Sequence, residues 1–303
     1  EDGIRDSVAS RGLGDVYKRQ SLHYISFLLN TKFSHKYCHN RDSKVELFHF
    51  VHYMLAIISP SKTQDFSSCD IESHTQTRQL NDSNELVGIL KNKSQEQISK
   101  LMSVSEKLSK LNFERFQKFK TPFTLDNAKQ ALLAFKGDVY SGIDAPSLSN
   151  KDLDFAQENV RMLSGLYGVL RPLDLIQPYR LEMGTKLNNH KGKNLYDYWG
   201  SEISEVLNED ESELIVNLAS NEYFKAIDKK TLKADILDVV FKDKKADTYK
   251  VIGIYAKRAR GLMVNYIIRN RLTNAESLKN FSDEGYRFDE KLSSETVWVY
   301  LRD

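Results

Sequence analysis

From residue 54 onward, apolar and polar residues follow patterns that predict both helices and strands. Residues 55–58 form a short apolar run that stops at a Ser-Pro pair, as a buried strand entering a loop does. Ser94 and Gln97 form a capping box ahead of apolar positions with helical spacing, which predicts an amphipathic helix over residues 95–110.

The same patterns continue to the end of the chain. Further helices are predicted over residues 126–140, 150–163, 195–208, 221–227 and 261–272. Strands are predicted over residues 178–182, 213–217, 235–241, 249–256 and 295–301. Because helices and strands mix without a strict βαβ rhythm, we expect one α+β domain with a mixed sheet over residues 54–303.

Residues 1–53 show neither a sustained helical period nor an alternating strand pattern. Five of the seven histidines fall before Met54, whereas all five prolines fall after it. The amino-acid composition of the chain therefore changes at Met54. A secretory signal is disfavoured, because the apolar patch at residues 26–29 is short and no small-residue cleavage pattern follows it. We expect residues 1–53 to be a non-domain leader, non-native or disordered, with Met54 as the start of the protein.

The composition is that of a globular chain, with 40% hydrophobic and 28% charged residues. No apolar run is long enough to span a bilayer, so no membrane partner is expected. The two cysteines, Cys38 and Cys69, are too few for a disulfide framework, which suits a reducing compartment. We therefore expect a cytoplasmic location, while the sequence indicates no oligomeric state.

Several catalytic signatures are absent from the sequence, including the GxxxxGK[ST], GxGxxG, GxSxG and HExxH motifs. After residue 53 only His74, His190 and Cys69 could supply nitrogen or thiolate ligands, too few for a zinc site. Neither a metal nor a cofactor is therefore expected. An enzyme built from this chain would have to use Lys, Asp, Glu or Tyr for proton transfer.

The loop that follows the first strand is the first candidate binding site. Lys62 and Thr63 lie there beside two serines, and loops at the carboxyl ends of strands are where mixed sheets bind ligands. A lysine beside hydroxyl groups suits a phosphate, whereas a solvated turn lysine is the plainer interpretation. Ser59 and Lys62 also match the Ser-x-x-Lys pattern of serine acyl enzymes, but the companion KTG motif is missing.

Lys136 and Asp138, together with Tyr140, close the helix predicted over residues 126–140. These three side chains could converge on a ligand, and a buried lysine beside an aspartate could have a perturbed pKa. A surface salt bridge at a helix end is the alternative, and the sequence alone favours it.

A glycine hairpin over residues 163–169 follows the helix predicted at 150–163. Its candidate phosphate-binding residues are Ser164, Gly165, Gly168 and the nearby Arg171. Two glycines between apolar helical patterns let the chain turn sharply and expose backbone amides, which resembles a helix-hairpin-helix that grips DNA phosphates. The usual hairpin has its glycines two residues apart rather than three, and an ordinary turn between helices is the alternative.

Two further groups of residues lie at element ends. Strand alternation puts Arg180 and Glu182 on one face, so Arg180 could face a cleft or form a structural ion pair. Ser220 begins a helix directly after a predicted strand, where Asn217, Ser220 and Lys225 could contact an anion together. Helix capping alone would also explain Ser220.

Positive charge gathers in residues 225–271, which hold thirteen Lys and Arg residues against five Asp residues. At the centre of this stretch, Lys257, Arg258 and Arg260 lie where a predicted strand passes into a helix. Such a cluster favours a nucleic-acid contact over a merely solvated basic face.

Together these segments resemble the YaaA peroxide-stress protein family. The matching segments are residues 59–63, 134–140, 161–183, 217–225 and 255–261, and the likeness runs from Met54 to nearly the C-terminus. The resemblance implies a bacterial cytoplasmic protein that limits damage from iron and oxidants, with a basic cleft and a DNA-binding helix-hairpin-helix. The cleft residues that it implies by position are Lys62, Lys136, Arg171, Arg180, Lys225, Lys257 and Arg260.

The leading hypothesis is a stress protein that holds the phosphate backbone of duplex or distorted DNA without sequence specificity. The alternative is a lysine-dependent enzyme that acts on a nucleotide or a damaged DNA base. Its candidate catalytic residues are Lys62, Lys136, Asp138 and Glu182. Direct iron sequestration is a third possibility, with little support because no His/Cys cluster is present.

Overall fold

The computed structural model describes residues 54–303, and the expected leader lies outside the described residues. The main sheet consists of β1 (Met54–Ile58), β5 (Val160–Ser164), β6 (Gly168–Leu170), β8 (Leu214–Leu218), β9 (Asp235–Lys245), β10 (Thr248–Lys250), β11 (Arg287–Phe288) and β12 (Val297–Arg302). The strand order is β11-β12-β9-β8-β1-β5-β6, and β10 pairs with β9. The five central strands from β12 to β5 are parallel, whereas β6, β10 and β11 are antiparallel to their neighbours.

Two small sheets and ten α-helices complete the described part. The small sheets pair β2 (Thr63–Gln64) with β4 (Phe135–Lys136), and β3 (Lys129–Gln130) with β7 (Leu175–Ile176). The helices are α2 (Leu80–Lys91), α3 (Gln95–Met102), α4 (Glu106–Lys118), α5 (Ala131–Ala134), α6 (Asp138–Ile143), α7 (Asn150–Asn159), α8 (Leu195–Trp199), α9 (Glu202–Asn208), α10 (Asn221–Phe224) and α11 (Gly253–Arg269). Three 3-10 turns are η1 (Ala145–Ser147), η2 (Glu276–Asn280) and η3 (Asp283–Gly285).

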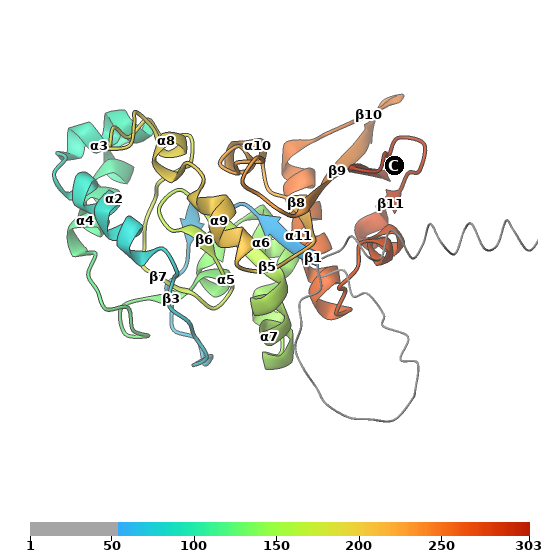
Figure 1. Cartoon of the computed structure of the whole chain (residues 1–303), viewed down its shortest axis with the longest axis horizontal. Coiled ribbons are helices and arrows are strands. Elements are labelled where there is room, and N and C mark those ends of the chain that lie inside the picture. The colour runs from blue at the N-terminus through green and yellow to red at the C-terminus, as the bar shows by residue number, and fades with distance from the viewer. Residues whose placement is uncertain (1–53) are drawn as a thin grey trace, which may run out of the picture. The chain divides into compact units, whose positions relative to one another are not determined.

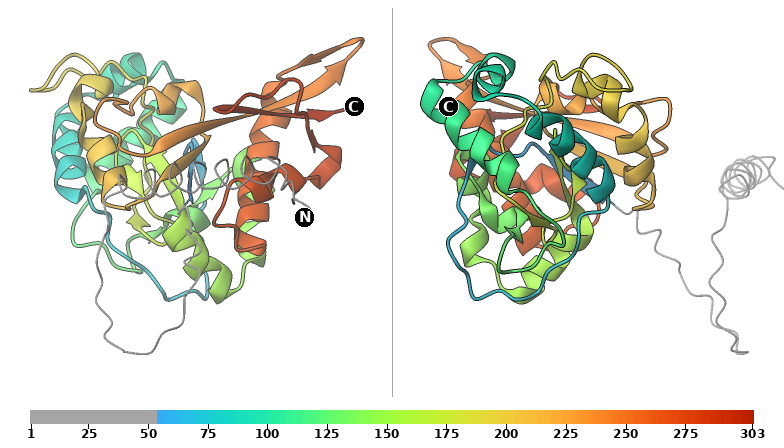
Figure 2. Two further views of the ribbon diagram at one scale, coloured as in Figure 1. Left: turned by 45° about the vertical axis from the view of Figure 1, so that its right-hand side comes forward. Right: turned by 90° about the vertical axis from the view of Figure 1, so that its left-hand side faces the viewer.

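The helices are distributed unevenly around the sheet. Helices α2, α3 and α4 pack together as a group, which Figure 1 shows at the opposite end of this domain from β10 and β11. Helix α7 packs on β1 and β5, and α11 packs on both β9 and α6. The β9–β10 hairpin projects past the rest of the sheet (Figure 2). All five residues of β1 are buried, as expected for a parallel strand with neighbours on both sides.

The prediction of a single α+β domain with a mixed sheet is confirmed. The first strand and the capping box at Ser94 are confirmed as well, since the Ser94 hydroxyl accepts a hydrogen bond from the Gln97 amide. The helix predicted over residues 95–110 is instead two helices, α3 and α4. Ser103 interrupts it by adopting the left-handed conformation, with φ of 51°, and α4 then begins after its own cap at Ser105.

Three other predicted elements are wrong. Residues 126–140 contain β3, α5, β4 and the start of α6, and Gly137, with φ of 113°, separates β4 from α6. Residues 178–182 form no strand, although Tyr179 and Leu181 are buried against the core. Residues 249–256 are mostly not a strand, because α11 begins at Gly253.

The predicted helix-hairpin-helix over residues 163–169 is wrong, because these residues form a β-hairpin. Helix α7 ends at Asn159, and β5 then pairs with the antiparallel β6, with Ser164 opposite Gly168. Gly168 supplies the positive φ of 66° that the turn needs. At Gly165 a Cβ atom would lie 2.5 Å from the Leu181 carbonyl oxygen, so this glycine permits close packing rather than exposing amides.

Candidate functional site

The candidate site lies at the carboxyl edge of the parallel strands, between β1 and β8. The chain leaves β1 towards β5 on one side and leaves β8 towards β9 on the other, so the two strands flank a topological switch point. The loops meet there through Ser59 and Ser220. The Ser59 hydroxyl accepts a hydrogen bond from the Ser220 amide at 2.8 Å and donates to the Ser220 hydroxyl at 3.2 Å.

An ion-pair cluster beside these loops brings five of the predicted residues together. Lys62 Nζ lies 2.5 Å from Glu182 Oε2, and the Arg180 guanidinium donates to Glu182 Oε1 at 3.0 Å. The Lys62 side chain remains 59% exposed. Thr63 and Lys136 are directly paired in the β2–β4 ladder, which places Lys136 next to the same loop. Glu182 is thus a shared counterion for two cations.

Arg115 is a cationic residue of this site that the sequence interpretation missed. Burial and, after it, the neighbouring charge of Arg180 lower the pKa of Arg115 from its ordinary value. Arg180 itself has a buried Nε that donates no hydrogen bond within residues 54–303. Lys62 and Arg180 therefore share the Glu182 carboxylate, and Arg115 adds a third cationic side chain whose charge acts on Arg180. No local sequence signal marks Arg115, because its role depends on how α4 packs against a distant segment.

Arg260 is another cationic side chain that lacks a counterion within the described residues. It lies in the first half of α11, whose next residue, Gly261, packs against Val139 of α6. Its guanidinium is largely buried, burial lowers its pKa, and it has no hydrogen bond or ion pair within residues 54–303. Because a buried charge without a partner is energetically costly, the charged form of Arg260 is destabilised in the fold.

Three buried tyrosines, Tyr140, Tyr179 and Tyr223, lie next to the site. The Tyr140 hydroxyl donates to the Ser59 carbonyl oxygen at 3.0 Å, and the Tyr179 hydroxyl lies 2.8 Å from Ser164 Oγ. Burial raises the pKa of Tyr140, Tyr179 and Tyr223, and the neighbouring Tyr179 adds to the effect at the other two. All three stay neutral near pH 7, so they add polar groups without adding negative charge. Of these three tyrosines, only Tyr140 was a candidate from the sequence.

The remaining exposed candidates differ in whether their charges are paired with a carboxylate. Lys225 and Lys257 are exposed and form no ion pair within the described residues. Arg258 is paired with Glu284 at 2.6 Å, which also raises the pKa of Arg258. Asp138 is exposed at the start of α6. Lys225 and Lys257 are therefore the more available of these cations.

The hairpin candidates and Arg171 are not brought to this site. Ser164, Gly165 and Gly168 are all buried, and the Ser164 hydroxyl is occupied by Tyr179 and by amides of its own turn. Arg171 follows β6, which runs back from the carboxyl edge, and it is paired there with the buried Asp174 at 2.9 Å.

A helix pair joined by a short turn occurs at α3 and α4. Ser103, Val104 and Ser105 form the turn, with small residues two positions apart, and the Ser105 hydroxyl caps α4. The amides of Ser105, Glu106 and Lys107 donate no hydrogen bond within the described residues. The Ser-Val-Ser sequence between two capped amphipathic runs was the signal that could have located this turn.

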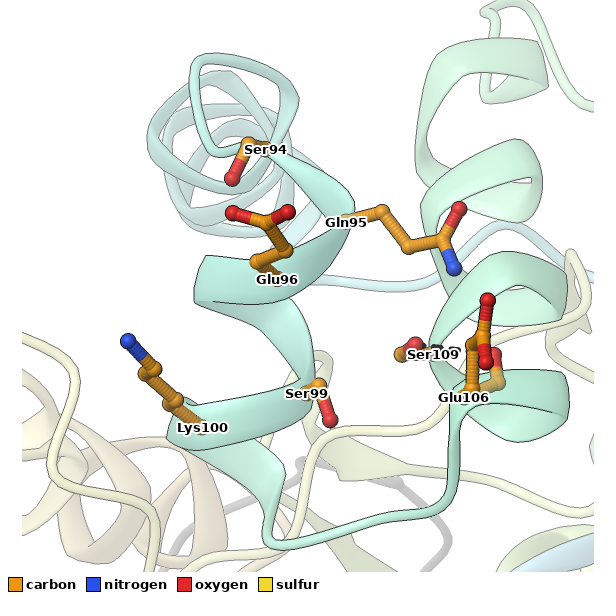
Figure 3. A pocket seen from close by; sticks show the side chains of 7 residues that line it. All are labelled: Ser94, Gln95, Glu96, Ser99, Lys100, Glu106 and Ser109. Carbon is orange, nitrogen blue, oxygen red and sulfur yellow. Dashed lines mark hydrogen bonds between the residues drawn. The ribbon is translucent and has the colours of Figure 1, made fainter.

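An open hollow of about 620 Å³ lies between α3 and α4. Figure 3 shows the side chains that line it, which are Ser94, Gln95, Glu96, Ser99, Lys100, Glu106 and Ser109. Its two carboxylates make the hollow itself a poor site for a phosphate. The turn at residues 103–105, which joins the two helices, is the part of this helix pair that offers free amides.

Among the described residues, no helix is both long and apolar enough to cross a membrane. The same residues contain no group of three or more His, Cys, Asp or Glu side chains that could hold a metal ion.

Comparisons with known proteins agree on one family. The family described as "Peroxide stress protein YaaA" matches residues 54–292. A UPF0246 protein of Acaryochloris marina is 55% identical over 252 residues, which cover 82% of this chain and all of that protein. UPF0246 proteins of Aliivibrio fischeri and Idiomarina loihiensis are 52% and 51% identical, with 82% of this chain and 98% of each relative covered. The chain belongs to the peroxide stress protein YaaA family.

Proposed function

We propose that this peroxide stress protein binds the phosphate backbone of DNA at the carboxyl edge of its sheet, without sequence specificity. The observation that carries the proposal is the surplus of guanidinium groups there. The charge of Arg115 acts on Arg180, Arg180 shares Glu182 with Lys62, and Arg260 has no partner in the described residues. Phosphate oxygens are the natural acceptors for such groups, and binding them offsets the cost of burying the charges.

Two features support a polynucleotide rather than a single small anion. Lys62, Lys225 and Lys257 are exposed cations that extend the positive surface beyond the partly buried arginines. The α3–α4 turn offers free amides at the start of a thirteen-residue helix, beside the exposed Lys107. Amides at helix N-termini and lysines contact phosphates and carry no base information, which is why no sequence preference is proposed.

The test is a fluorescence-anisotropy titration of the full chain with duplex and bubble DNA at several salt concentrations. We expect Lys257→Ala combined with Arg260→Ala to weaken binding and to reduce the salt slope by about 2, since each lost phosphate contact removes about 0.9. Lys233→Ala is the control, because this exposed lysine lies just before β9 at the opposite edge. No binding at low salt, or equal binding by the double variant, would refute the proposal.

A second candidate function is supported by the contact between Lys62 and Glu182. At 2.5 Å this carboxylate is close enough to exchange a proton with the amine, as a lysine nucleophile requires. The amine would add to the aldehyde carbon of an abasic deoxyribose and lose water to give an imine. Borohydride reduces that imine to a stable protein–DNA adduct. Adduct formation that disappears in Lys62→Arg would support this activity, and no adduct with the wild-type chain would refute it.

A further inference from the structure

A cavity of about 190 Å³ lies beside the candidate site, between α5, β4, α6 and η1. It is lined by Leu132, Leu133, Phe135, Lys136, Gly137, Tyr140, Ser141, Asp144, Ala145 and Pro146. Two residues that line the cavity, Gly137 and Tyr140, lie against the loop after β1. A Cβ atom on Gly137 would lie 3.2 Å from Ser61 Oγ, and the Tyr140 hydroxyl bonds to the Ser59 carbonyl. The cavity thus opens next to the cationic edge.

The lining divides into an apolar interior and a polar rim. Leu132, Leu133, Phe135 and Ala145 are all buried, whereas Ser141, Asp144 and Pro146 are exposed. The volume corresponds to about six water molecules, which suits one planar heterocycle and not a whole nucleotide.

The rim carries groups that match a nucleotide. Lys136 is 40% exposed, and its ion pair with Asp65 is long, at 3.6 Å. Arg258, which is paired with Glu284 at 2.6 Å, also donates to Ser141 Oγ at 3.3 Å, so this arginine lies at the mouth together with its counterion. The Asp144 carboxylate accepts no hydrogen bond within the described residues, so it is free to accept an N–H group.

An exposed apolar residue stands near the mouth. Ile254 is 59% exposed and lies four residues before Arg258 in α11, so the two share a helix face. Its neighbour Val251 is 54% exposed. Apolar side chains flanked by lysines are what proteins insert between base pairs when they distort DNA.

We propose that this cavity receives a single nucleobase unstacked from bound DNA. The ring occupies the apolar interior, Asp144 accepts one of its N–H groups, and Lys136 and Arg258 contact the flanking phosphates. Ile254 fills the gap left in the base stack. The inference rests on the proposed DNA binding and adds to it a contact with one base.

The experiment uses the full chain and DNA with one 2-aminopurine, placed either in a bubble or in a paired duplex. Fluorescence of this base rises when it leaves the stack, so we expect a severalfold rise on saturation with wild-type protein. Ser141→Trp blocks the mouth from an exposed position, and Ala145→Leu fills the interior. Both should abolish the rise while changing the affinity for paired duplex by less than about twofold. Asn188→Trp, at an exposed residue outside the cavity, should keep the rise.

The outcomes separate the two proposals. DNA binding without any fluorescence rise overturns the base pocket and leaves backbone binding standing. A rise that survives both Ser141→Trp and Ala145→Leu also overturns the pocket. If either variant loses affinity for paired duplex as strongly as it loses the rise, the cavity residues act in general binding and the pocket is refuted. Absence of DNA binding overturns both proposals.

Discussion

Gly142 of α6 packs directly against Gly261 of α11. A Cβ atom at Gly261 would lie 3.0 Å from Gly142 Cα and would overlap the Val139 carbonyl oxygen, and one at Gly142 would lie 2.4 Å from the Arg258 carbonyl oxygen. The two helices therefore touch backbone to backbone. This contact holds α6, which carries Tyr140 and one wall of the cavity, in a fixed place on α11.

Gly261→Ala is expected to destabilise the protein, because the added methyl group must push the two helix backbones apart. Overpacking of this kind costs about 1–3 kcal/mol in the free energy of unfolding, which urea denaturation can measure. Gly88→Ala in α2 is the control. A Cβ atom at Gly88 meets nothing within 4 Å, so alanine there should stabilise the protein by up to about 1 kcal/mol. Equal effects of the two substitutions would contradict the close contact.

Arg115→Ala is expected to weaken DNA binding without loss of fold stability. The substitution removes a charge that Arg180 repels, so the free energy of unfolding should stay level or rise. The affinity for DNA should fall, because one phosphate contact is lost. Thermal unfolding and anisotropy titration of the same preparations give both quantities. A variant that unfolds more easily would indicate that Arg115 is structural.

The lowered pKa of the Asp152 carboxyl group predicts that the protein loses stability in acid. Hydrogen bonds from Ser149, followed by those from Arg271, hold its pKa below the ordinary value of 3.8. Because the folded state favours the charged form, the stabilisation is fully present above that value and is lost as pH falls through the lower, folded-state pKa. Asp152→Asn should be less stable at neutral pH and should show a shallower decline in urea midpoint below about pH 4. An unchanged pH profile would exclude this contribution.

Ser103 adopts a strained backbone conformation at the α3–α4 turn, and substitutions can test it. Its φ of 51° lies in the left-handed region, which costs most L-residues about 1–2 kcal/mol and glycine much less. Ser103→Gly should therefore retain or slightly increase stability and should retain DNA binding. Ser103→Val should lower the unfolding midpoint, because a branched Cβ fits this conformation poorly. Equal stability of the two variants would contradict the assigned turn.

Local signals in the sequence predicted local structure well. The capping box at Ser94 located the start of α3, because both partners of the cap lie within one turn. The run that became β5 was taken as helical because a short apolar stretch does not distinguish a buried strand from a helix. The residues before Arg258 were taken as a strand for their aromatic and branched side chains, although they form a helix that packs on α6 and β9.

The candidate site was predictable only in part. Lys62, Lys136 and Arg180 were found because they stand at the ends of elements, and the structure brings them together. Arg115 could not be found, because it reaches Arg180 only through tertiary packing. Arg171 lies at the other edge of the sheet because β6 reverses direction, which no spacing rule revealed.

The hydrogen bonds between Ser59 and Ser220 have a consequence for ligand binding. They join loops whose strands lead into opposite halves of the sheet, one towards β5 and the other towards β9. A ligand seated at these loops would therefore contact segments that lead into both halves of the sheet at a single point.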